Sequence, residues 1–286
     1  MMLIHIRNLR RLLHGAVLLI LLLGPLPLES WGQTVTAPQG IISIQLNSEF
    51  LVHGNLLEVR YRTSPGTLQG PVDLYFAVAI PNHEGLLFLQ NNALSLEPKP
   101  FRTNVTIVEE RTTLIHIYPT EIPFGTYACY MALVHAGRPL SDANPFASPI
   151  AVASFTFAAL SQEQLALVTQ RGKPDLLTFM WIEAQFEKRE TWYYYSGTPT
   201  QYSFVNGELK EQSALLGSAE GTTPQIDPSL LTPTTTLDQL SAALGPPTGV
   251  AALVTGSPDY QTVSFAVGLD AVFFKGRLIF GRTSTP

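Results

Sequence analysis

The sequence predicts a β-rich protein, all-β in its first part and α+β in its second. We expect an antiparallel β-sandwich followed by two small helix-plus-antiparallel-sheet repeats. Proline (22) and glycine (21) are frequent and charged residues make up only 14%, a mixture typical of strands joined by many turns. Short apolar segments separated by turn residues fill residues 41–158. Residues 161–212 and 236–281 each combine a short helical stretch with one shared pattern, Phe-x-x-Gly-x-Leu.

Residues 1–32 have the pattern of a secretory signal peptide. Three arginines between positions 7 and 11 precede the apolar run 16–23, and residues 30–32 place small side chains at the −3 and −1 positions of a cleavage site. The alternative is an uncleaved membrane anchor, but a span needs about 20 apolar residues and prolines interrupt this run. We therefore expect cleavage after Gly32, no stable membrane span afterwards, and export to the periplasm or the extracellular space.

The net charge limits the classes of molecule that the chain can bind, and the cysteine content shows how its cores are stabilised. The chain has a formal net charge of −5 and no basic stripe, so nucleic acid and anionic membrane surfaces are poor candidates. Its one cysteine, Cys129, cannot form an internal disulfide, and we expect it to be a small buried apolar side chain. The cores of an exported chain of this kind must be stable without a covalent crosslink.

Strand-like segments predict the first domain, residues 41–158. The clearest is 57–62, where Leu57, Val59 and Tyr61 alternate with charged side chains, as in a strand with one buried face. The further expected strands are 72–80, 86–89, 104–108, 113–118, 126–136 and 150–157.

One stretch of this domain has a specific form. Tyr127 stands two residues before Cys129 and directly after a Pro-Phe-Gly bend, which is the arrangement of a tyrosine corner. Together with 73–78 and with Gly137-Arg138-Pro139 followed by Asn144-Pro145, it resembles immunoglobulin-like sandwich modules of exported bacterial proteins. The second cysteine of the immunoglobulin pair is absent. The resemblance implies a fold and no particular function.

Helix-capping residues and turn glycines predict the two later units. Ser161 is a candidate N-cap, and Gly172 ends the helix that follows; Thr236 and Gly245 have these roles in the second unit. Gly207 and Gly276 lie in hairpin turns, and Asn206-Gly207 has the residue types that a type I′ turn requires. The segment between the units, 213–235, is small, polar and rich in proline and threonine, so we expect a linker.

The first unit resembles a known small domain of the bacterial envelope. A helix ended by Gly-x-Pro, then Arg189 to Tyr194, then the Phe-x-x-Gly-x-Leu pattern at 204–209, is similar to the BamE (SmpA/OmlA) family. The tandem arrangement is similar to β-lactamase inhibitor proteins, which join two helix-plus-sheet units into one continuous sheet. The second unit has Val263-Ser264-Phe265 where the aromatic pair stands in the first. The resemblance implies a non-enzymatic role in binding other proteins.

An aromatic cluster in the first unit is the candidate protein-binding face. In a strand, Trp192 and Tyr194 project to one side and Tyr193 and Tyr195 to the other. One side must cover the helix, so part of the cluster is core, and the whole cluster as core remains the alternative. Exposed aromatic side chains favour protein interfaces. The cluster consists of Trp181, Trp192, Tyr193, Tyr194, Tyr195 and Tyr202.

No motif for catalysis or for a cofactor stands out. His-Glu-x-x-His, P-loop and Gly-x-Ser-x-Gly patterns are absent, and no histidine pair after residue 32 has metal-ligand spacing. A calcium site at Glu109, Glu110 or Asp142 is left open. We expect no enzymatic activity and no cofactor. Two functions remain: an exported envelope protein that binds another protein through the aromatic sheet face, or a structural or adhesive protein whose sandwich binds a glycan or surface component.

Overall fold

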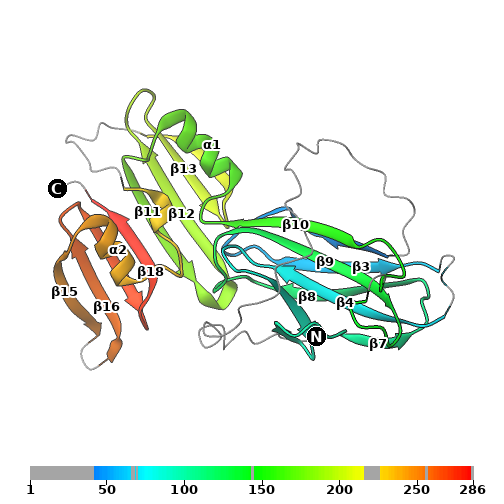
Figure 1. Cartoon of the computed structure of the whole chain (residues 1–286). Helices are drawn as coiled ribbons and strands as arrows, with labels where there is room; N and C mark the ends of the chain where they lie inside the picture. Colours follow the sequence, from blue (N-terminus) through cyan, green and yellow to red (C-terminus); the bar gives the residue numbers. More distant parts are fainter. Residues whose placement is uncertain are drawn as a thin grey trace.

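The computed structural model describes residues 42–65, 68, 70–142, 145–215, 226–254 and 257–284. The predicted signal peptide, 1–32, and the residues up to 41 lie outside this part of the chain. The described residues form an N-terminal region (42–158) and a C-terminal region (159–284), which lie side by side (Figure 1). Within the described residues, no helix is both long and apolar enough to cross a membrane.

The N-terminal region consists of two sheets. Its strands are β1 (Ile42–Leu46), β2 (Phe50–Val52), β3 (Leu57–Thr63), β4 (Val72–Ala79), β5 (Leu86–Gln90), β6 (Ala93–Ser95), β7 (Arg102–Val105), β8 (Glu110–Ile117), β9 (Gly125–His135) and β10 (Ala151–Ala158). One sheet has the order β1-β3-β8, and the other has the order β2-β10-β9-β4-β5-β6 with β7 paired to β4. The pairs are antiparallel except for β2 and β10, which run parallel and depart from the all-antiparallel prediction.

Alternation along the strands builds the core between the two sheets. Val59 and Tyr61 of β3 are buried, whereas the intervening charged side chains face outward. Cys129 is buried, as expected, and burial raises the pKa of its thiol to about 12. The Tyr127 hydroxyl donates to the Pro123 carbonyl oxygen at 2.6 Å. This is the hydrogen bond that a tyrosine corner requires.

The C-terminal region is one continuous eight-stranded sheet with the order β14-β13-β12-β11-β18-β17-β16-β15. The elements are α1 (Gln162–Arg171), β11 (Leu176–Ile182), η2 (Glu183–Gln185), β12 (Glu187–Tyr194), β13 (Thr200–Val205), β14 (Glu208–Ala214), η3 (Pro228–Leu230), α2 (Leu237–Leu244), β15 (Pro247–Val254), β16 (Ser257–Phe265), β17 (Leu269–Phe274) and β18 (Arg277–Thr283). Each half of the sheet follows the same order, one helix and then four antiparallel strands. Pairing of β11 with β18 joins the halves.

Local signals place the two helices where they were expected. Ser161 and Thr236 both form capping boxes, which satisfy backbone N–H groups at the helix start. Gly172 and Gly245 end the helices with φ of 80° and 90°, a conformation that favours glycine. Both helices cover the same face of the sheet, because Leu167 of α1 and Leu240 of α2 belong to one apolar core.

The described part of segment 213–235 is not a linker, contrary to expectation. Its first residues extend β14 to Ala214, and residues 216–225 lie outside the described chain. From Ile226 onward the segment packs into the core, where Ile226 and Leu231 are buried. Thr235 accepts a hydrogen bond from the backbone N–H of Thr232. Buried apolar anchors and satisfied polar groups therefore outweigh the loop-like composition.

The hairpin turns of the C-terminal sheet contact the N-terminal region. The Asn206 side-chain amide donates to the Gly54 carbonyl oxygen at 3.1 Å, and the Asn55 side-chain amide donates to the Asn206 carbonyl oxygen at 3.2 Å. Phe186 stacks on Tyr118 with ring centroids 4.7 Å apart. These contacts come from loops of both regions and fix one end of the first half of the sheet.

A buried ion pair lies in the first half, next to this junction. The Lys188 ammonium is 2.9 Å from a Glu190 carboxylate oxygen, and both side chains are almost fully buried. Glu190 also accepts from the Gln164 side-chain amide at 2.6 Å, and Lys188 donates to the Ala159 carbonyl oxygen at 3.0 Å. Hydrogen bonds on both partners reduce the cost of removing the two charges from water.

His53 fills the space between the two regions. Its ring is buried and lies edge-on to Phe157 (4.9 Å between centroids), Phe124 (5.4 Å) and Trp181 (6.5 Å). Burial, with the charge of Lys188 as a second cause, lowers the pKa of His53 to about 3. The imidazole is therefore neutral at physiological pH.

Candidate protein-binding face

The eight-stranded sheet has one face under the helices and one face that the helices do not cover, called here the open face. Strand alternation assigns residues to each. In β11, Leu177 and Phe179 are buried against the helices, so Thr178 and Met180 project to the open face. Residues directly opposite each other in an antiparallel pair share a face, so the strand register extends this assignment across the sheet.

Three members of the predicted aromatic cluster are core residues. Trp192 (0% exposed), Tyr194 (1%) and Tyr202 (9%) pack under the helices. The Tyr194 hydroxyl donates to the Gly172 carbonyl oxygen at 3.0 Å, and the Arg171 guanidinium lies 4.7 Å from the centre of its ring. Burial raises the pKa of Tyr194 to about 12. These side chains stabilise the fold and are inaccessible to a partner, which corrects their assignment to a binding face.

The remaining members are divided among three places. Trp181 is half-buried on the helix side, opposite Lys188 in the register, and packs at the junction against His53. Tyr193 projects to the open face, where it lies opposite Leu176. Tyr195 follows the end of β12, and its backbone N–H donates to Asp175 at 2.6 Å. Within the eight strands, Tyr193 is thus the member of the cluster that the register places on the open face.

A different set of apolar side chains is contiguous on the open face. Tyr260 lies opposite Phe274, and their ring centroids are 4.5 Å apart. Val272 follows on the same side of β17 and lies opposite Phe280, which in turn lies opposite Met180. Met180 is 41% exposed. We call these five residues the apolar stripe; it crosses β16, β17, β18 and β11.

Basic side chains border the apolar stripe. The Lys275 ammonium lies 5.1 Å from the centre of the Phe274 ring, within the range of a cation–π contact. Arg282 follows Phe280 on the same side of β18, and Arg189 lies opposite Met180. Lys275 and Arg282 form no ion pair with another described residue.

The other charges near the stripe are partly compensated. Arg189 pairs with Glu187, and Arg277 pairs with Glu121 of the N-terminal region. One carboxylate, Asp270, lies on the same side of β17 as Val272 and directly opposite Arg282 in the register. The border of the stripe therefore has a small excess of positive charge, which favours a partner with acidic groups around an apolar centre.

The sequence contained a signal for the stripe that the prediction did not use. In 269–274, Leu269, Ala271 and Phe273 are buried, so Val272 and Phe274 must face the other way. Adjacent phenylalanines in a strand necessarily lie on opposite faces. This alternation, together with the apolar residues of β18, marked two apolar faces in the second unit.

No metal centre is formed by the described residues. Glu109, Glu110 and Asp142, the carboxylates considered for calcium, belong to no group of three or more side chains that could hold a metal ion within the described part of the chain.

No protein-family model, no curated protein and no solved structure matches this chain.

Proposed function

We propose that this is an exported, non-enzymatic envelope protein that binds another protein through the apolar stripe. The observation that carries the proposal is the contiguity of Tyr260, Phe274, Val272, Phe280 and Met180 on the face that the helices leave uncovered. The partner is a protein of the envelope or the extracellular space. Its contact surface has an apolar centre and an acidic border.

The composition of the stripe supports binding of a protein. Tyrosine, phenylalanine, methionine and arginine are enriched at protein interfaces, and a few such side chains commonly supply most of the binding free energy. Met180 is exposed and the other four side chains of the stripe are half-buried, and a contiguous apolar surface that is only partly covered is typical of a protein-binding site. The basic border adds orientation and a faster association with an acidic partner.

The arrangement of the C-terminal region supports the family resemblance as a proposal. Two halves with the same order of one helix and four strands join into one sheet through β11 and β18, which is the arrangement that the resemblance to β-lactamase inhibitor proteins implies. We propose that the halves are copies of one BamE-like unit. The two packed sheets and the Tyr127–Pro123 hydrogen bond likewise support an immunoglobulin-like N-terminal module.

The test changes Met180, the most accessible member of the stripe, to aspartate. Met180→Asp places a negative charge opposite the acidic border of the partner, and we expect binding to weaken by at least thirty-fold, or about 2 kcal/mol. The measurement first identifies the partner by a photo-crosslink from position 180 in the exported protein, and then compares dissociation constants with the purified partner.

Leu165→Asp is the matched control, because Leu165 is similarly exposed (45%) but lies on α1, away from the open face. Binding that is lost with Met180→Asp and kept with Leu165→Asp supports the proposal. Equal binding by both variants and the unchanged protein would show that the open face is not the contact surface.

The alternative is a structural or adhesive role in which the N-terminal region binds a glycan. One observation favours a site of this kind, a polar groove on the outer face of the three-stranded sheet. The groove is separate from the apolar stripe, so the two functions are compatible.

A further inference from the structure

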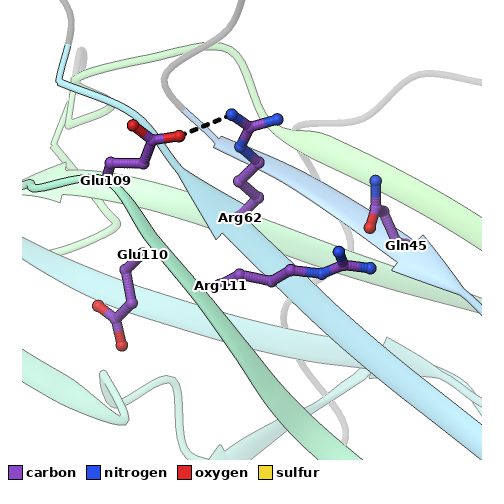
Figure 2. Close-up of a pocket in the computed structure, with 5 residues that line it drawn as sticks. All are labelled: Gln45, Arg62, Glu109, Glu110 and Arg111. Carbon is purple, nitrogen blue, oxygen red and sulfur yellow. Dashed lines mark hydrogen bonds and ion pairs between the residues drawn. The ribbon is translucent and has the colours of Figure 1, made fainter.

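The outer face of the sheet β1-β3-β8 carries a groove formed by two neighbouring depressions. They have volumes of about 240 and 320 Å³, and both are lined by Gln45 and Arg111. One end is completed by Arg62, Glu109 and Glu110, the last of which is paired with Arg102, and the other end is lined by Arg60, Glu58, Leu46 and Asn47. Figure 2 shows the Arg111 side chain extended toward Gln45 while Arg62 turns to Glu109. We call this site the Arg111 groove.

The arginines of the groove are unequally neutralised. Arg60 pairs with Glu58 at 2.6 Å and Arg62 pairs with Glu109 at 2.7 Å. Arg111 forms no ion pair with any described residue. It also lies directly opposite Arg62 in the register of β3 and β8. Like charges directly opposite each other destabilise a sheet; the Glu109 carboxylate compensates Arg62, so Arg111 is the arginine of the groove whose charge a bound anion would neutralise.

The exposed side chains at the centre of the groove have no hydrogen-bond partner among the described residues, so they are open to water or to a ligand. The Asn47 side chain bonds to the backbone at Leu56 and Glu58, so it is already satisfied within the protein. The side chains of Gln45 and Arg111, by contrast, make no hydrogen bond to another described residue. The two groups shared by both depressions are thus the two that remain available to a ligand.

The lining selects the chemistry of the ligand. A guanidinium presents parallel N–H donors that fit a carboxylate in a bidentate contact. The amide of Gln45 can both donate to and accept from hydroxyl groups. Apart from Leu46, the lining residues carry polar or charged groups, and the aliphatic parts of the long side chains supply apolar surface between these groups. A chain of hydroxylated units that carries carboxylates satisfies all of these groups.

We propose that the Arg111 groove binds an acidic saccharide, with a sugar carboxylate on Arg111, a hydroxyl group on Gln45, and neighbouring sugar units in the two depressions. This site does not depend on the apolar stripe or on the protein partner. The bound carboxylate supplies the counter-charge that Arg111 lacks within the described residues.

The test measures binding of a galacturonate trisaccharide to the exported protein by titration calorimetry at low salt. Arg111→Gln removes the charge, and we expect the affinity to fall at least ten-fold. Arg111→Lys keeps the charge without the bidentate contact and should retain part of the affinity. Arg138→Gln is the matched control, since Arg138 is an exposed arginine of the same region outside the groove.

A second measurement separates loss of binding from loss of folding. Arg111→Gln should unfold in urea at the same or a slightly higher concentration than the unchanged protein, because it removes a like-charge pair. Binding that is lost in Arg111→Gln, kept in Arg138→Gln and absent for a neutral galactose trisaccharide supports the proposal. Unchanged affinity in Arg111→Gln, no binding of the acidic trisaccharide at millimolar concentration, or equal displacement by inorganic sulfate would each overturn it.

Discussion

The two halves of the eight-stranded sheet share their element order but differ in what they contact. Their hairpin turns are almost identical in backbone conformation: Asn206 and Lys275 have φ of 50°, and Gly207 and Gly276 have φ of 78°. The first turn is packed against the N-terminal region and against Ser161, which donates to the Gly207 carbonyl oxygen at 2.6 Å. The second turn has open space around its glycine.

The two halves also differ in the residues of their interiors and of their open faces. The first half contains the buried Lys188–Glu190 pair and the packed rings of Trp192 and Tyr194, and it contributes one residue, Met180, to the apolar stripe. In the second half Val263 and Phe265 are buried in β16, and the open face carries most of the apolar stripe. The comparison teaches that one arrangement of elements can have different surroundings: the first half packs closely against the N-terminal region, whereas the second half contacts it through the Arg277–Glu121 pair and carries most of the proposed contact surface.

The largest expected effect concerns the buried ion pair of the first half. Lys188→Ala leaves the Glu190 carboxylate buried without its cation, and we expect the free energy of unfolding to fall by about 3–5 kcal/mol. Urea melts followed by circular dichroism measure the change. Lys210→Ala, which removes an exposed partner of Glu208, should leave the melt unchanged. The double variant Lys188→Met with Glu190→Leu should recover most of the loss; if it does not, the pair is not the cause.

The next effect, which is absent at neutral pH, is expected from His53, which packs against the first half. The unfolded chain takes up a proton at this residue below about pH 6.5, whereas the folded protein resists protonation down to about pH 3. Its contribution is therefore constant above pH 6.5. Below that pH the free energy of unfolding should fall by roughly 1.4 kcal/mol for each unit, until about pH 3.

Melts at several pH values between 7 and 4 measure this slope. His53→Phe, which suits the surrounding aromatic rings, should reduce the slope by that amount. His116→Gln is the control, because His116 is an exposed histidine of the same region. Equal slopes in all three proteins would mean that protonation of His53 is not linked to unfolding.

The smallest effect compares the two turn glycines directly. At both positions φ is positive, so alanine is strained by about 1 kcal/mol. At Gly207 a Cβ would also lie 2.7 Å from the Ser161 Cβ and 2.9 Å from Val52, which adds a steric cost that Gly276 does not have. We expect Gly207→Ala to lower the free energy of unfolding by about 2 kcal/mol and Gly276→Ala by about 1 kcal/mol. Equal losses would contradict the closer packing of the first turn against its surroundings.

The sequence by itself determined the local backbone of this protein. Ser161 and Thr236 cap their helices by hydrogen bonds to the residue three positions later in the chain. Gly207 and Gly276 have positive φ, a conformation that other residues rarely adopt. Alternation in β3 likewise separated buried from solvent-facing residues, because the period of a strand is fixed by its geometry. These features depend on neighbours in the chain, so the chain alone specifies them.

Only the tertiary structure decided which face of a strand is covered and which distant strands meet. Alternation places Trp192 and Tyr193 on opposite sides but contains nothing to say which side lies under α1. The linker-like composition before Thr235 did not predict the buried Leu231, because its packing site is formed by residues far along the chain, including Gly281. The pairing of β11 with β18 and the opposition of Arg62 to Arg111 depend in the same way on contacts between remote segments. Burial is a property of the assembled core, and a local pattern can give only the set of candidates.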